Sequence, residues 1–255
     1  MQIFLSCLVI LGLIAGILLS FEVGYRIGIR RRLRNPEIVS VHQTMEASIF
    51  GLLALLVAFT FYAAGSRFEN RRILTAREAN AIGTAYLRLD LLPPETQPRI
   101  REDFRTYVRS RLAVYEAIPD LNAVRVALER SVALQESIWE KVVAALKGSG
   151  PAEKAHMLSS LNEMIDITTD REVAAMTHTP PLVLALLGLT VIASSSLAGY
   201  TMSISMIRDW PPIIVFALML GIALYLTLDY EYPRVGFIRI DAVDQVLTET
   251  LNQMK

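Results

Sequence analysis

The feature that most constrains this chain is an uncharged run, residues 47–65, which continues without a proline into a charged segment of helical spacing. Its nineteen residues, at about 1.5 Å each, extend about 28 Å and so nearly match a hydrocarbon core of about 30 Å. No proline follows until Pro93, and apolar residues recur at helical spacing as far as Leu89. We therefore expect one helix over about residues 45–92 that leaves a bilayer and enters a helical domain outside it.

Three further stretches lack charge, and each is long enough, or nearly so, to cross a bilayer. Helices of a soluble core do not need such long uncharged runs, and 53% of the chain is hydrophobic. No Lys or Arg precedes the first run, so we expect a retained span rather than a signal peptide. The sequence therefore predicts a multispanning membrane protein with spans near residues 3–23, 45–65, 181–207 and 211–229.

Most of the charge lies between the second and third spans, where turn sequences divide the chain into helical segments. These breaks are Pro93-Pro94, Pro119-Asp120 and Gly148–Pro151. With the end of the long helix they give four helices joined by short loops, which predict an antiparallel bundle. The expected fold class is all-α. Its predicted parts are the first two spans with an Arg-rich loop (1–65), the bundle (66–179, with helices over 99–118, 121–147 and 152–177), the last two spans (180–229) and a tail (230–255) with an amphipathic helix from Asp241.

Five arginines follow the first span, at positions 26, 30, 31, 32 and 34. Such a cluster is typical of a topology signal, although it also suits anionic lipid headgroups. Counted over short loops, the positive charge predicts that this loop is cytoplasmic, and that both termini and the bundle lie on the other side. The third span contributes a second open question, because its hydroxyl-bearing residues 194–205 suit either close helix packing or a wet path.

The sequence carries no motif of a known catalytic site. It contains no phosphate-binding loop, nucleophile elbow, HExxH or dinucleotide fingerprint, and its three histidines share no ligand spacing. One cysteine excludes a disulfide within the chain or a Cys-based metal cluster. The formal net charge of zero gives no reason to expect a nucleic-acid partner. We expect no enzyme activity, no cofactor and no metal.

Three sets of charged residues remain as possible sites. Glu46, at the mouth of the second span, suits a functional role or the positive end of its helix dipole. Arg77 and Arg88 begin and end a polar helical stripe, beside Glu78 and Asn80, that lines an ion vestibule or faces solvent. A third set lies on one face of a later helix and suits a hard cation or a solvated face paired with Arg171 and neighbouring helices: Glu163, Asp166 and Asp170.

Several segments resemble the bestrophin-like family of bacterial membrane proteins. They are GLLALLVAFTF after Glu46, then SRFENRR, EANAIGTAYLRLDLLP, LNEMID and LDYEYPRVGFIRI, which together extend over nearly the whole chain. The family-motif residues among them that we single out are Asn162, Glu163, Asp166, Asp229 and Arg234. Bestrophins are pentameric anion channels with four spans per subunit, so the resemblance implies a homo-oligomer in the lipid bilayer of the bacterial plasma membrane.

By position, the resemblance implies a pore lined by residues 47–65. The implied constriction, with Glu46 at its mouth, is drawn from Ile49, Phe50, Leu53, Phe59 and Tyr62; the implied vestibule comprises Arg67, Arg71, Arg77, Glu78, Asn80 and Arg88. The acidic run of the calcium clasp in animal bestrophins is missing here, so calcium gating is not implied. Bestrophins also keep their termini and soluble helices in the cytoplasm, which is opposite to the charge count above.

Two functions from different classes therefore stay open. The first is an oligomeric ion channel, and the second is a membrane-anchored interaction or sensor protein whose helical bundle binds a partner. The layout also matches proton-driven motor proteins, which need a protonatable or hydroxyl residue deep in the bilayer. Thr60 and Thr190 are the obvious candidates for that role, so this third fit is poor.

Overall fold

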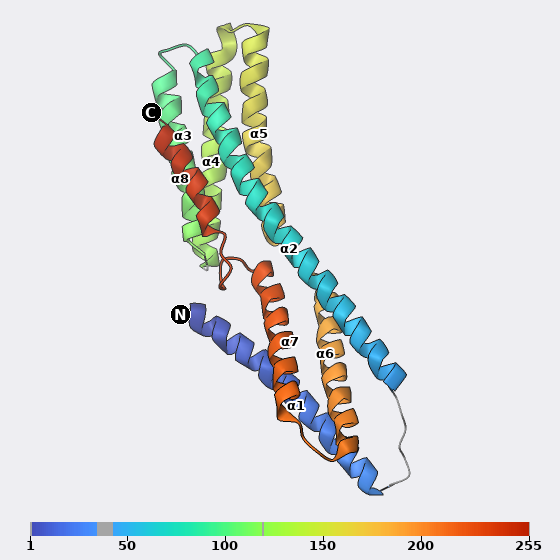
Figure 1. Cartoon of the computed structure of the whole chain (residues 1–255). Helices are drawn as coiled ribbons and strands as arrows, with labels where there is room; N and C mark the ends of the chain where they lie inside the picture. Colours follow the sequence, from blue (N-terminus) through green and yellow to red (C-terminus); the bar gives the residue numbers. More distant parts are fainter. Residues whose placement is uncertain (1, 35–42, 119, 255) are drawn as a thin grey trace. The chain divides into compact units, whose positions relative to one another are not determined.

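The structure of the chain is a computed structural model, and it describes residues 2–34, 43–118 and 120–254 (Figure 1). Within these ranges every regular element is a helix. In chain order the elements are α1 (Gln2–Arg34), α2 (Gln43–Leu87), η1 (Arg88–Leu91), α3 (Gln97–Glu116), α4 (Leu121–Ala145), η2 (Leu146–Gly148), α5 (Pro151–Met176), α6 (Pro181–Met202), η3 (Ser203–Ser205), α7 (Trp210–Glu231) and α8 (Asp241–Gln253). The prediction of an all-α fold is confirmed, and in the part of the chain that the structure describes α1, α2, α6 and α7 are four helices long and apolar enough to cross a membrane.

The first predicted span, residues 3–23, lies within α1, which continues through the arginines to Arg34, because arginine is a good helix former and cations suit a helix C-terminus. The sequence also predicts that a helix ends at Asn35-Pro36, and these two residues lie outside the described ranges. The long helix is α-helical to Leu87 and closes with the 3₁₀ turn Arg88–Leu91, since the residue before a proline disfavours helical geometry.

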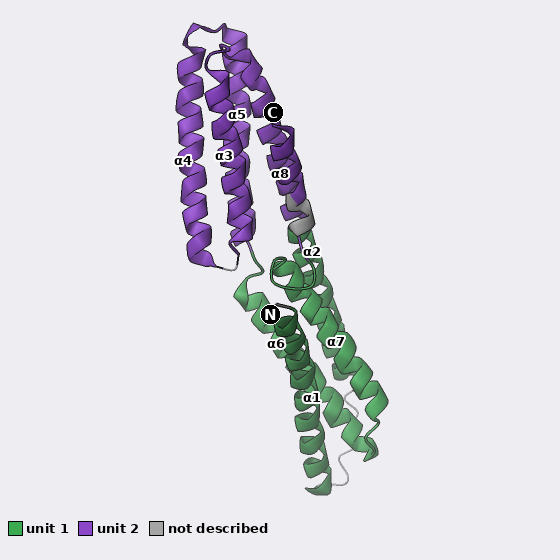
Figure 2. Cartoon of the chain, turned by 90° about the vertical axis from the view of Figure 1, so that its left-hand side faces the viewer, with its two compact units in different colours: residues 1–68, 178–238 green, residues 69–177, 239–255 purple. Residues whose placement is uncertain are grey.

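The chain forms two compact units (Figure 2). Unit 1 comprises residues 1–68 and 178–238, and unit 2 comprises residues 69–177 and 239–255. α2 contributes its first part to unit 1 and its second part to unit 2. The tail expected as one part, residues 230–255, is divided between the two units.

Unit 1 is built on a very close crossing of α1 and α6. A Cβ atom at Gly24 would lie 1.8 Å from the Ser196 carbonyl oxygen, and one at Gly199 would lie 2.0 Å from the Phe21 carbonyl oxygen. Only residues without a side chain permit the two backbones to approach this closely. Ser194, fully buried, donates its hydroxyl to the Thr190 carbonyl at 2.7 Å. At this crossing, Ser194, Ser196 and Gly199 of α6 serve helix packing.

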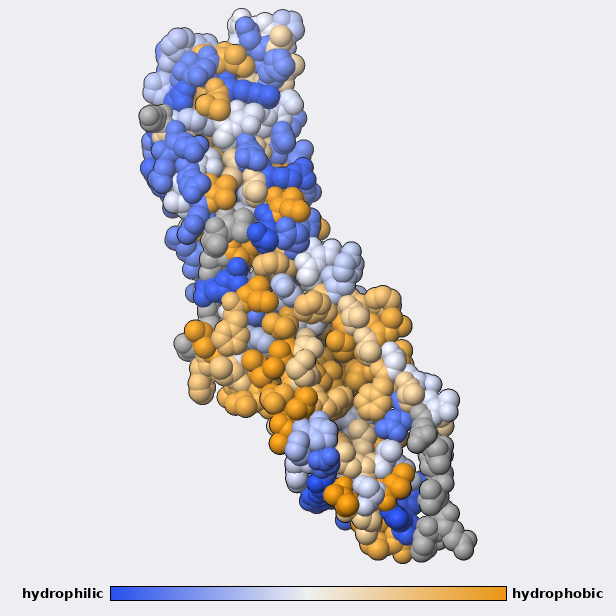
Figure 3. Space-filling view, viewed as in Figure 1, coloured by the Kyte–Doolittle hydropathy of each residue, from blue (hydrophilic) through white to orange (hydrophobic). Residues whose placement is uncertain are grey.

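The outer surface of unit 1 is apolar. Figure 3 shows hydrophobic side chains gathered over the region of α1, α6 and α7. Large exposed side chains there include Leu8, Leu19, Leu189, Ile192 and Met219. An apolar surface of this kind suits lipid chains rather than water.

Unit 2 has an ordinary buried core. Helices α3, α4, α5 and α8 and the end of α2 contribute fully buried side chains, namely Ile82, Phe104, Tyr107, Ile138, Leu161 and Leu247. Asp120 begins α4 by accepting hydrogen bonds from the Asn122 and Ala123 amides at 3.0 and 3.2 Å, as an N-cap residue does. Helices α2 to α5 lie side by side in both ribbon views (Figures 1 and 2).

Candidate functional site: the outward face of α2

One face of α2 within unit 1 packs against the other spans. Leu53 is buried in a cluster with Ile17, Leu187 and Ala217. Phe50 is half-buried and meets Phe216 edge-on at 5.9 Å between ring centroids. Of the residues predicted for a constriction, Leu53 is thus buried within unit 1, and Phe50 and Ile49 are half-buried.

The opposite face of the same helix is open. Leu52, Leu55, Phe59 and Tyr62 are 48%, 50%, 62% and 75% exposed. Their spacing of three, four and three residues places them in one line along a helix. We call these four residues the outward stripe. The predicted residues Phe59 and Tyr62 belong to it, whereas Leu52 and Leu55 were not singled out from the sequence.

Glu46 lies at the start of α2, and its side chain is half-buried. Its carboxylate accepts a hydrogen bond from the Thr201 hydroxyl of α6 at 2.9 Å. A polar contact between two spans satisfies a carboxylate that would be costly in an apolar setting. Glu46 therefore joins α2 to α6 within unit 1.

Three of the four arginines predicted for a vestibule are bound within the chain. Arg67 forms an ion pair with Glu231, with Nε and Oε1 3.1 Å apart. Arg71 donates to the carbonyls of Ala174 and Thr177, at 3.0 and 2.9 Å, and so caps the end of α5. Arg88 donates to the His156 carbonyl at 2.6 Å. Arg77 and Asn80, by contrast, are exposed on the part of α2 that belongs to unit 2.

Glu78, predicted beside the polar stripe, is instead completely buried. Its carboxylate accepts from Arg111 Nε at 2.6 Å, from Arg171 and from the Tyr115 hydroxyl at 3.4 Å. Arg171 was expected among the partners of the acidic face on α5, and it turns inward to Glu78. The cluster supports the interior of unit 2 and presents no carboxylate to an ion.

Arg111 was not singled out from the sequence, although a signal was present. It continues the buried face of α3 marked by Phe104, Tyr107 and Val108, and a charge on such a face requires a buried partner. Burial by itself lowers the pKa of Arg111, but attraction to Tyr115, Glu78 and Tyr107 outweighs it and raises the pKa above its ordinary value. The guanidinium therefore stays charged.

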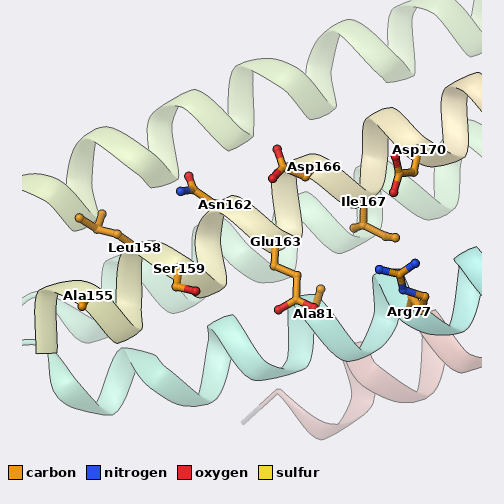
Figure 4. Close-up of a pocket in the computed structure, with 10 residues that line it drawn as sticks. All are labelled: Arg77, Ala81, Ala155, Leu158, Ser159, Asn162, Glu163, Asp166, Ile167 and Asp170. Atoms are coloured by element: carbon orange, nitrogen blue, oxygen red, sulfur yellow. The ribbon is translucent and has the colours of Figure 1, made fainter. Parts of the chain in front are cut away.

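The acidic face of α5 borders a groove beside α2 in unit 2 (Figure 4). The groove has a volume of about 610 Å³ and is lined by Arg77, Ala81, Ala155, Leu158, Ser159, Asn162, Glu163, Asp166, Ile167 and Asp170. The three carboxylates make no ion pair with other described residues. Among the described residues no group of three or more His, Cys, Asp or Glu is placed to hold a metal ion.

The late family-motif segment forms a tight turn at the end of α7. Asp229 is buried and accepts from the Phe237 and Ile238 amides at 3.1 and 2.8 Å, and from the Tyr225 hydroxyl at 3.2 Å. Arg234 lies half-buried in the same turn. Glu231, which the sequence interpretation did not single out, is buried two residues after Asp229.

Comparison with known proteins identifies the family of this chain and solved structures with the same fold. The sequence matches the Bestrophin-like domain over residues 11–244. The chain belongs to the bestrophin-like family. Solved structures of a bacterial bestrophin homolog from Klebsiella pneumoniae, each carrying a different point mutation, have the same fold: three of them superpose with TM-scores of 0.72, 0.73 and 0.74 at 16% identity, covering 94–95% of this chain and 98–99% of theirs. No curated protein sequence matches the chain.

Membership in the bestrophin-like family confirms the resemblance carried by the sequence segments quoted above. The match extends over both compact units, from within α1 to within α8. Together with the four apolar helices it makes the chain a membrane protein.

Proposed function

We propose that this bestrophin-like chain is one subunit of an oligomeric ion channel that crosses the bacterial inner membrane several times and lines its pore with α2. The outward stripe is the observation that supports this most. Four large side chains lie in one line on a helix whose other face is packed against the subunit's own spans. A face left open by the subunit is available to copies of itself around a central axis.

The chemistry of the outward stripe suits a constriction. Leucine, phenylalanine and tyrosine side chains repeated around a ring make a narrow apolar passage, and such passages gate by dewetting. Tyr62 adds a hydroxyl at the end of the stripe, where the helix approaches the charged segment that begins at Ser66. In a monomeric anchor the same side chains would instead face lipid, so the oligomeric state separates the two functions.

The proposed ion is an anion, as the likeness to bestrophins implies. Fewer arginines are available to attract an anion than the sequence predicts. Arg67 pairs with Glu231, and Arg71 and Arg88 donate to backbone carbonyls. Arg77 remains exposed and forms no ion pair with other described residues. Arg77 lines a groove together with three carboxylates, so the assignment to anions rests on the likeness to bestrophins rather than on a net positive charge at this place.

The proposal is tested by replacing one residue of the outward stripe and one of the buried face. Phe59→Ala removes a ring from the constriction and should raise halide flux into liposomes containing the purified protein. Leu53→Ala, the matched control, removes a side chain buried within the subunit, so it should lower stability by about 2–5 kcal/mol with little change in flux per folded channel. A monomer in detergent that passes no halide in either form would favour the membrane-anchored interaction protein.

A further inference from the structure

The end of α7 lies next to every place where the chain passes between the two units. These crossings occur after Phe68 within α2, before His178 in the link from α5 to α6, and after Ile238 on the way to α8. Each crossing is bonded, on its unit 1 side, to a carboxylate near the end of α7. Those carboxylates are Asp229 and Glu231, and both are buried.

Glu231 holds the first two crossings. Its carboxylate pairs with Arg67, which directly precedes Phe68 on α2, and accepts from the hydroxyl of Thr179, which directly follows His178. Arg67 also donates to the Thr179 hydroxyl, so the three side chains form a closed set. Only 2% of the Glu231 side chain is exposed, so removing Arg67 would leave a buried carboxylate without its ion-pair partner, which is costly.

Asp229 holds the third crossing. It accepts from the amides of Phe237 and Ile238, the last residues of unit 1 before the chain leaves for α8. Gly236 lies so close that a Cβ atom there would be 1.3 Å from the Asp229 Oδ1 atom. The returning turn is therefore fitted to this carboxylate, and no side chain larger than hydrogen is accommodated.

Aromatic side chains support the same end of α7. Tyr230 packs against Phe61 and Phe68 of α2, with ring centroids 5.5 and 5.2 Å apart. Tyr232 stacks on His178 of the α5–α6 link at 4.9 Å. The packing thus joins the same segments that Glu231 joins through polar contacts.

We infer that Glu231, through Arg67, positions α2 as the pore-lining helix, and that Asp229 and Glu231 together form a hub that holds, on the unit 1 side, the three chain segments leading to unit 2. The inference rests on the proposed channel function. Arg67 follows Tyr62 by five residues, which places the two side chains about 140° apart around a helix. Anchoring Arg67 to α7 therefore fixes the rotation of α2 and turns Tyr62 and Phe59 away from α7.

The hub is tested by reversing and then restoring its central ion pair. Arg67→Glu and Glu231→Arg each place two like charges together and should change halide flux about fivefold or more, a usual size for coupling between sites. The double variant restores an opposite pair and should return flux to within about twofold of the unmodified channel. Glu69→Gln is the matched control, because Glu69 is exposed on the same helix and pairs only with nearby Arg72 among described residues; its flux should not change.

Single variants that keep the unmodified flux and oligomeric state would overturn the hub. Where a charge reversal prevents folding, Glu231→Gln and Thr179→Val weaken the same contacts without adding a charge. Unchanged halide flux in both of these variants would likewise overturn the hub.

A second readout separates the hub from the channel proposal. In Glu231→Gln, hydrogen exchange should quicken together in the peptides that contain Arg67, Thr179 and Ile238, whether or not the protein conducts. Faster exchange confined to the peptide that contains residue 231 would overturn the hub. If the unmodified protein passes no ion, yet Glu231→Gln shows the joint change in exchange, the channel proposal is overturned and the hub remains as a set of contacts that stabilises the fold.

Discussion

At the scale of single residues, unit 2 depends on a charge inside its core. Glu78 is fully buried and lies between two guanidinium groups, those of Arg111 and Arg171, and Arg171 also stacks over the Tyr115 ring at 4.4 Å. With both oxygens of Glu78 bonded, the cost of burying the carboxylate is offset by the contacts it makes. Removing one member of such a set leaves the others buried and uncompensated, which is more harmful than losing a surface pair.

Glu78→Gln should accordingly destabilise the protein by about 3–5 kcal/mol. The measurement is denaturant unfolding of the purified protein in detergent. Glu69→Gln, at an exposed pair on the same helix, should cost at most about 1 kcal/mol. Equal effects of the two substitutions would contradict the role assigned to the buried cluster.

A glycine also determines how closely α1 and α6 can pack. Gly24 meets the backbone of α6, whereas Gly16 on the same helix has no atom within 4 Å of a built Cβ position. Gly24→Ala should lower the melting temperature by several degrees, because α1 and α6 must separate to admit the methyl group. Gly16→Ala should leave it unchanged or slightly raised, and a similar loss in both variants would show that the crossing is looser than described.

At the scale of elements, the long helices could be predicted because long segments without charge or proline are sufficient to indicate a membrane-spanning helix. Residues 47–65 carry no charge and no proline, and the structure has one helix from Gln43 to Leu87. Asp120 and Gly148–Pro151 likewise mark the start of α4 and of α5.

The side-chain partners of the candidate site were not predictable in the same way. Arg67 and Arg71 look alike in the sequence, yet one pairs with Glu231, 164 positions away, and the other caps α5. Local spacing contains no information about such distant partners. For the same reason Leu53 and Leu52 could not be assigned to opposite faces until the other spans were in place.

At the scale of the whole molecule, orientation in the membrane follows from charge near the spans. Arg30, Arg31 and Arg34 are exposed at the end of α1, and positive charge next to a span favours the cytoplasm. Unit 2 should then face the other side. In a Cys7→Ser background, Lys147→Cys between α4 and α5 should react with an impermeant maleimide in intact spheroplasts.

The control for orientation is Arg31→Cys at the end of α1, which should react only after lysis. If the two sites exchange behaviour, the charge count is wrong and the orientation implied by the likeness to bestrophins is right.

The central claim is that α2 lines a conducting pore with its outward stripe, and a cysteine scan of α2 tests it most directly. Single cysteines at positions 50–62, in the Cys7→Ser background, would be treated with a small water-soluble thiol reagent while halide flux is recorded in liposomes. Modification should block flux at positions 52, 55, 59 and 62 and leave it unchanged at positions 53, 57 and 60, which face the subunit's own core. Block without this helical period, or block confined to the inward positions, would contradict the account.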